Sequence, residues 1–156
     1  MVDAGILQLQ AALVERFEAQ PDWEARYKLI IEYGRSLAPL PEAFRTEANK
    51  VRGCASTVWL HATFDGRLVT YLADSDAILV RGLIALLLAV YSGHTPQQIL
   101  DAPPAFIEEL GLNTHLTTNR ANGLSAMVRQ LMVYALAFKA QAGSSAGTGT
   151  GTGTGA

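Results

Sequence analysis

Cysteine is almost absent from this chain of 156 residues, which has a single one, Cys54. One cysteine excludes an intramolecular disulfide framework. It also excludes a four-thiolate zinc or iron–sulfur site built from this chain alone. Any cysteine chemistry in this protein is therefore the chemistry of a single thiol.

Net charge is also small, because 12 Lys and Arg stand against 14 Asp and Glu, for a formal charge of -2. A chain without positive excess lacks the electrostatic basis for binding a phosphate backbone, so we expect no nucleic-acid partner. The sequence has no glycine-rich phosphate loop, and His61, His94 and His115 show no spacing typical of metal ligands. We therefore expect neither a bound metal nor another cofactor.

Long hydrophobic runs are missing as well. The most apolar stretch, residues 78–91, contains Arg81 and is shorter than the roughly 20 residues of a membrane-spanning helix. We expect a buried helix there and no membrane partner. The first residues resemble neither a secretory signal nor a transit peptide, so we expect a cytoplasmic protein.

What the chain does have is apolar residues, at 49%, with only 17% charged residues, a composition typical of one folded domain. We assign this domain to residues 1–142. Residues 143–156 are only Gly, Ser, Thr and Ala, and we expect a flexible tail there.

Hydrophobic spacing predicts one helix that ends before Pro21 and a second that begins after Asp22 and stops at Pro39. Two alternating runs, residues 58–64 and 67–73, flank Asp65-Gly66 and predict a β-hairpin with a two-residue type I′ turn. The fold class is therefore α+β, with a small antiparallel sheet of about three strands packed against helices. Residues near 50–56 are candidates for the third strand.

Helices are expected on the far side of the hairpin too. A buried helix from about Ala77 to Ser92 has Asp74, Ser75 and Asp76 as candidate caps. A helix from about Asn119 to Gln141 has apolar residues at helical spacing. Shorter helices are expected within residues 41–48, 95–100 and 104–110, where prolines occupy first-turn positions.

Cys54 lies in a loop close to Lys50 and Arg52. Cations near a thiol favour the nucleophilic thiolate, which suggests a reactive cysteine. The alternative is a small, inert, buried side chain. Arg120 stands at a helix N-terminus, which disfavours a cation, so we expect it to have a carboxylate or backbone partner.

Four ordered blocks of sequence resemble one known family, and they span about Trp23 to Phe138. The blocks are WEARYKLII at 23–31, RGCASTVWL at 52–60, DSDAILVRGL at 74–83 and LTTNRANGL at 116–124. Together they resemble the SufE/CsdE family of sulfur acceptor proteins. This resemblance implies a fold like that of SufE and the related scaffold IscU, with residues 1–142 as the acceptor domain.

The resemblance also implies a function. Cys54 would take persulfide sulfur from a pyridoxal-phosphate-dependent cysteine desulfurase, SufS- or CsdA-like, and pass it to a downstream iron–sulfur scaffold. The protein would then be a sulfur carrier and desulfurase activator rather than a stand-alone enzyme. The persulfide loop would consist of Arg52, Gly53, Ala55 and Ser56 around Cys54, and Gly53 would let the loop swing outward.

Three further residues, Asp74, Asp76 and Arg120, are candidates for partner docking or loop positioning. From the residues alone, both aspartates could instead cap a helix, and Arg120 could form a structural ion pair. Ala55 stands where many relatives have Gln, and the Gly/Thr-rich tail matches nothing in the family. Other functions stay open: a redox-sensing thiol, a cluster scaffold that borrows ligands from a second chain, or an interaction module with an inert cysteine.

Overall fold

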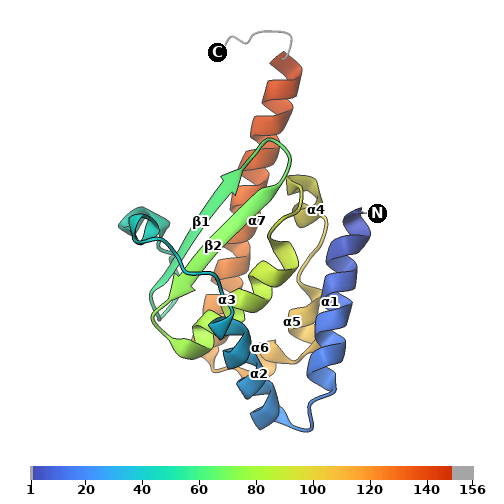
Figure 1. Cartoon of the computed structure of the whole chain (residues 1–156), viewed down its shortest axis with the longest axis vertical. Coiled ribbons are helices and arrows are strands. Elements are labelled where there is room, and N and C mark those ends of the chain that lie inside the picture. Colours follow the sequence, from blue (N-terminus) through green and yellow to red (C-terminus); the bar gives the residue numbers. More distant parts are fainter. Residues whose placement is uncertain (1, 149–156) are drawn as a thin grey trace.

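The computed structural model describes residues 2–148, and it describes side-chain packing within residues 5–143. Helices come first in the chain, then a hairpin, then more helices, so the expected α+β class is confirmed (Figure 1). The elements are α1 (Val2–Glu18), α2 (Trp23–Arg35), the 3-10 turns η1 (Glu42–Phe44) and η2 (Glu47–Asn49), β1 (Val58–Phe64), β2 (Val69–Ser75), α3 (Ile78–Tyr91), α4 (Pro96–Leu100), α5 (Ala105–Glu109), α6 (Leu112–His115) and α7 (Thr118–Thr148).

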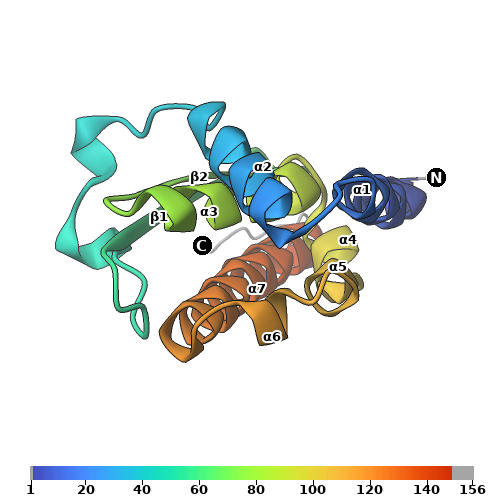
Figure 2. The ribbon, with the colours of Figure 1, turned by 90° about the horizontal axis from the view of Figure 1, so that it is seen from below.

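Helices α3 and α7 pack against the small sheet. The hairpin crosses α7, whose C-terminal turns project beyond the other elements (Figure 1). α2 packs along α3, and α1 contacts α3 and α5, as the end-on view shows (Figure 2). The largest fully buried side chains come from the helices and from β2 and form one core; they include Phe17, Ile30, Tyr71, Leu83, Tyr91 and Phe106.

Two buried tyrosines tie elements together through their hydroxyl groups. The Tyr71 hydroxyl donates to the carbonyl oxygen of Leu131, 2.7 Å away, and so joins β2 to α7. The Tyr91 hydroxyl donates to the carbonyl oxygen of Ala102 over 2.6 Å. Burial raises the pKa of both phenols well above the ordinary value, so both remain neutral donors.

The closest helix contact lies between α2 and α3, at two glycines. A Cβ at Gly34 would lie 2.8 Å from the backbone nitrogen of Gly82. A Cβ at Gly82 would overlap the carbonyl oxygen of Ile30. The two helix backbones can approach this closely only because neither position has a side chain.

The hairpin turn differs from the prediction. Phe64 pairs with Val69, so the strands are joined by residues 65–68 and not by a two-residue turn. Only Gly66 within this connection has a positive φ, at 99°, whereas a type I′ turn needs two such residues. The Asp65 carboxylate accepts bonds from the backbone N–H groups of Arg67 and Leu68, at 2.8 and 2.7 Å, and this stabilises the longer loop.

Among residues 2–148 the sheet has two strands, and the expected third strand is reduced to a single antiparallel bridge between Lys50 and Trp59. Gly53, with a φ of 95°, turns the chain away after this bridge. A second bridge, between Val69 and His94, pairs the start of β2 with the segment after α3. The expectation of about three strands was therefore wrong by one strand.

Most predicted helices are confirmed, with changes at their ends. Thr95 forms a complete capping box with Gln98 at the start of α4. Residues 41–48 contain 3-10 turns instead of one helix, and α6 was not predicted. α7 continues past the expected end at Gln141 to Thr148, and the rest of the predicted tail lies outside the described residues. Within residues 2–148, no helix has both the length and the apolar character that a membrane span requires.

Candidate functional site

Cys54 lies in a short loop whose two ends are joined by a hydrogen bond. The loop connects η2 to β1, and the backbone N–H of Val51 donates to the carbonyl oxygen of Val58 over 2.9 Å. Gly53 has a φ of 95°, a backbone conformation that residues with a side chain rarely adopt. Its backbone also faces α7, since a Cβ at Gly53 would lie 3.3 Å from the Cβ of Ala126. The Val51–Val58 bond therefore closes the base of the loop, its neck, and Gly53 lies beside the cysteine with a positive φ.

The Cys54 thiol points at α7 and is half-buried. Its Sγ donates to the carbonyl oxygen of Gly123, 3.6 Å away. A side chain at position 123 would reach the sulfur, because its Cβ would lie 3.6 Å from Sγ. Because Gly123 has no side chain, the thiol can pack directly against the backbone of α7.

Burial raises the pKa of the Cys54 thiol above its ordinary value. The expectation that Lys50 and Arg52 lower this pKa was wrong. Lys50 instead has its ammonium 3.1 Å from a carboxylate oxygen of Glu47, and Arg52 is exposed. Burial in this conformation therefore favours the protonated thiol, which donates to Gly123.

The thiol borders a cavity of about 340 Å³ formed by the Cys54 loop, α3 and α7. Its apolar wall consists of Val80, Leu83, Leu124 and Met127. Polar residues also line the cavity, namely Ser56, Thr117, Asn119 and Arg120. A sulfur chain bound to Cys54 would meet both an apolar surface and hydrogen-bond donors in this space.

Arg120 lies on the first turn of α7, borders the cavity and is exposed. The expected carboxylate partner was not found, because the ion pairs formed among the described residues do not include Arg120. Its guanidinium is therefore available to an anion at the mouth of the cavity. The sequence placed Cys54 and Arg120 in separate blocks, and the fold brings them to one site.

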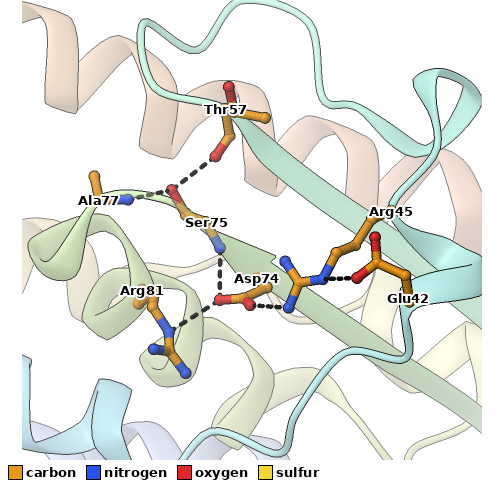
Figure 3. Close-up of polar contacts among 7 residues, drawn as sticks. All are labelled: Glu42, Arg45, Thr57, Asp74, Ser75, Ala77 and Arg81. Carbon is orange, nitrogen blue, oxygen red and sulfur yellow. Dashed lines mark hydrogen bonds and ion pairs between the residues drawn. The ribbon is translucent and has the colours of Figure 1, made fainter.

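Asp74, at the end of β2, is buried between two arginines (Figure 3). Its Oδ2 accepts a bond from Arg45 over 2.6 Å, and its Oδ1 lies 2.9 Å from Nε of Arg81. The Arg81 contact is an ion pair without the geometry of a hydrogen bond. Asp74 thus neither caps α3 nor faces solvent, and it joins the segment before the Cys54 loop to the start of α3.

The neighbouring residues fix the other end of the loop (Figure 3). The Ser75 hydroxyl donates to the carbonyl oxygen of Thr57 over 2.7 Å and accepts from the backbone N–H of Ala77 over 3.2 Å. Asp76 is exposed, and its backbone N–H also donates to the carbonyl oxygen of Thr57, over 3.4 Å. Neither aspartate side chain caps α3, whose N-cap is Ala77.

Sequence reasoning missed the two arginines that hold Asp74. Arg81 carried a signal, because a charged residue within an otherwise apolar helix needs a partner when the helix is buried. Arg45 carried none, since its pairing with Asp74 depends on how the segment before the loop folds back. In residues 2–148 there is no group of three or more His, Cys, Asp or Glu that could hold a metal ion.

Comparison with known proteins identifies the family. Residues 11–135 match the SufE family, described as an Fe-S metabolism associated domain. The chain belongs to the SufE family. The SufE resemblance of the four sequence blocks is thereby confirmed, and the family associates this protein with iron–sulfur metabolism.

Named relatives agree with this SufE assignment. The chain is 41% identical to an uncharacterized SufE-like protein of Synechocystis, over 89% of this chain and 87% of the relative. It is 45% identical to an uncharacterized SufE-like protein of Rhizobium meliloti, over 76% of this chain and 89% of the relative. Against SufE-like protein 1, chloroplastic/mitochondrial, of Arabidopsis thaliana, identity is 42% over 80% of this chain and 34% of the plant protein.

A solved structure shares the SufE-like fold. It is the solution structure of a hypothetical protein from Thermus thermophilus, with a TM-score of 0.72 and 25% sequence identity. The superposition covers 85% of this chain and 96% of the other. The small sheet packed against helices is therefore an arrangement shared by both proteins.

Proposed function

We propose that this protein accepts sulfur on Cys54 from the persulfide of a pyridoxal-phosphate-dependent cysteine desulfurase, SufS- or CsdA-like, and passes it to a downstream iron–sulfur scaffold. The observation that carries the proposal is the single thiol of a SufE-family chain, docked against Gly123 on the border of a cavity. The acceptor domain would be residues 1–142.

The chemistry is thiol–persulfide exchange. The Cys54 thiolate attacks the terminal sulfur of the donor persulfide, and a new S–S bond forms on Cys54 while the donor S–S bond breaks. The electron pair of the broken bond leaves with the donor thiolate, so no oxidant or reductant is needed. Cys54 loses its proton before the attack, and the proton goes to solvent or to a base of the donor.

The free protein holds this nucleophile in a resting state. Attack needs a thiolate, whereas burial raises the pKa of Cys54 and its thiol hydrogen is engaged with Gly123. Gly53 would be the hinge on which the loop opens toward the donor, and exposure would return the pKa toward its ordinary value. Transfer would thereby be confined to the complex with the donor.

The cavity would shelter the product after transfer. The persulfide on Cys54 is anionic near neutral pH, and the Arg120 guanidinium on the same cavity would stabilise it by a charge-assisted contact. No second cysteine of this chain can attack the persulfide and release the sulfur as sulfide. Asp76, exposed near the loop, would meet the partner, whereas Asp74 would position the loop.

The test is sulfur uptake measured by intact-protein mass spectrometry. The protein is incubated with the cysteine desulfurase encoded in the same genome and with cysteine, and we expect a mass gain of one sulfur atom, removable by a reducing agent. Cys54→Ser is the matched control and should gain nothing. An unchanged mass for the wild-type protein, or an equal gain on Cys54→Ser, would refute the proposal.

A further inference from the structure

A second hollow lies beside the Cys54 loop and has a different chemistry. It is a groove of about 300 Å³ between residues 48–52 and the middle of α7. Three cationic side chains border it, from Lys50, Arg52 and Arg129, and no carboxylate is among the lining residues. The groove is therefore locally positive, although the whole chain has a net charge of -2.

The positive charge of the groove is largely uncompensated. Arg52 and Arg129 are exposed, and neither takes part in the ion pairs formed among the described residues. Lys50 pairs with Glu47, but both side chains are solvent-exposed, and such pairs contribute little. An incoming carboxylate would therefore meet two free guanidinium groups and a weakly paired ammonium.

The floor of the groove, formed by α7, combines apolar side chains with Arg129 and Gln130. It includes Ala126, Val133 and Tyr134 of α7, and Val133 is 52% exposed. A small inorganic anion would leave this surface uncovered. A peptide segment with carboxylates beside an apolar side chain would match both the charge and the floor.

The groove adjoins the reactive cysteine. Arg52 is two residues before Cys54 in the chain. Ala126, on the floor, faces Gly53, whose Cβ position would lie 3.3 Å from the Ala126 Cβ. A segment bound here would contact both the loop that carries Cys54 and the helix on which its thiol is docked.

We propose that this groove binds a carboxylate-bearing segment of the sulfur donor, the cysteine desulfurase. This inference rests on the proposed function, and it adds the surface through which the donor is recognised. The donor fits better than the downstream acceptor because it meets Cys54 while the thiol is still docked. Binding at the hinge side of the loop couples recognition of the donor to release of the thiol from Gly123.

The test compares two charge reversals on the same helix. Arg129→Glu alters the groove, whereas Lys139→Glu changes an exposed cation of α7 outside it. The readout is the protein concentration that gives half-maximal stimulation of the desulfurase encoded in the same genome, at low and at high salt. We expect Arg129→Glu to raise this concentration about tenfold and to weaken its salt dependence, with little change for Lys139→Glu.

Further variants separate the possible outcomes. Lys50→Glu should reproduce the effect of Arg129→Glu, and an unchanged midpoint of urea unfolding checks that each variant is folded. Equal affinity of wild type and Arg129→Glu, or equal losses in both charge reversals, would overturn the groove as a docking site.

Failure of the proposed function would show differently from failure of the docking site. If the wild-type protein gains no sulfur from the desulfurase, the proposed function fails and the docking surface loses its donor. If the wild type gains sulfur but Arg129→Glu stimulates the desulfurase at the same concentrations, only the docking inference fails. The two measurements use the same purified desulfurase.

Discussion

Asp74 and Cys54 illustrate two consequences of burial for a single side chain. Asp74 is buried, and Arg45 and Arg81 supply opposite charges at short distance from its carboxylate. Cys54 is half-buried without a charge partner, and its pKa rises. The first residue stabilises the surroundings of the loop, and burial of the second favours its less reactive, protonated form.

The raised pKa of Cys54 predicts a pH profile for alkylation. A raised pKa means that the folded state favours the neutral thiol, so this contribution to stability is present below the unfolded pKa of about 8.5 and is lost as pH rises through the folded pKa. We expect the iodoacetamide reaction rate of the folded protein to rise at higher pH than that of the urea-unfolded protein. Because the chain has one cysteine, the signal is unambiguous. A folded midpoint at or below the unfolded midpoint would contradict the docked thiol.

Replacement of Asp74 tests the buried ion network. Asp74→Asn keeps the shape of the side chain but leaves the Arg81 guanidinium without its counter-charge, and leaves Arg45 with only the exposed Glu42 carboxylate, 3.6 Å away. Both arginines are partly exposed, so we expect a loss of about 2–3 kcal/mol in urea unfolding, less than is usual for a broken, fully buried pair. The matched control, Asp76→Asn, changes an exposed residue and should stay within about 0.5 kcal/mol. Equal effects of the two variants would refute the network.

At the scale of elements, the packing of α2 on α3 depends on glycine. Gly82→Ala would force the two helices apart, because the new methyl group meets the carbonyl oxygen of Ile30. We expect a loss of about 1–3 kcal/mol in urea unfolding, as for other overpacked interfaces. Gly143→Ala on α7, which meets no neighbouring atom, should be neutral or slightly stabilising. A neutral Gly82→Ala variant would mean that the helices can separate at little cost.

Local signals predicted most elements because the sequence agrees with local structure there. The apolar spacing of α1 and the Asp22 cap of α2 are examples, since a cap and a helical face depend only on neighbouring residues. The predicted two-residue turn was wrong because the Asp65 carboxylate accepts hydrogen bonds from two backbone N–H groups. These bonds compete with the type I′ geometry that Asp-Gly favours. The prediction of a third strand was wrong because Gly53 turns the chain away after the single bridge between Lys50 and Trp59.

At the scale of the whole molecule, the candidate site could be foreseen only in part. Cys54 was found from its sequence block, whereas the docking of its thiol on Gly123 joins residues far apart in the chain. The same holds for the cavity, which needs α3 and α7 packed side by side, and for the pairing of Arg45 with Asp74. No local pattern encodes these contacts, because they follow from tertiary packing.

The closed neck of the Cys54 loop sets how far the sulfur can travel. While the bond between Val51 and Val58 persists, Cys54 can move no farther from Val51 than three extended residues allow, about 10 Å. The loop is thus a short tether rather than a long swinging arm. In the proposed function, a donor would have to present its sulfur within that radius, so its docking would have to be accurate in position.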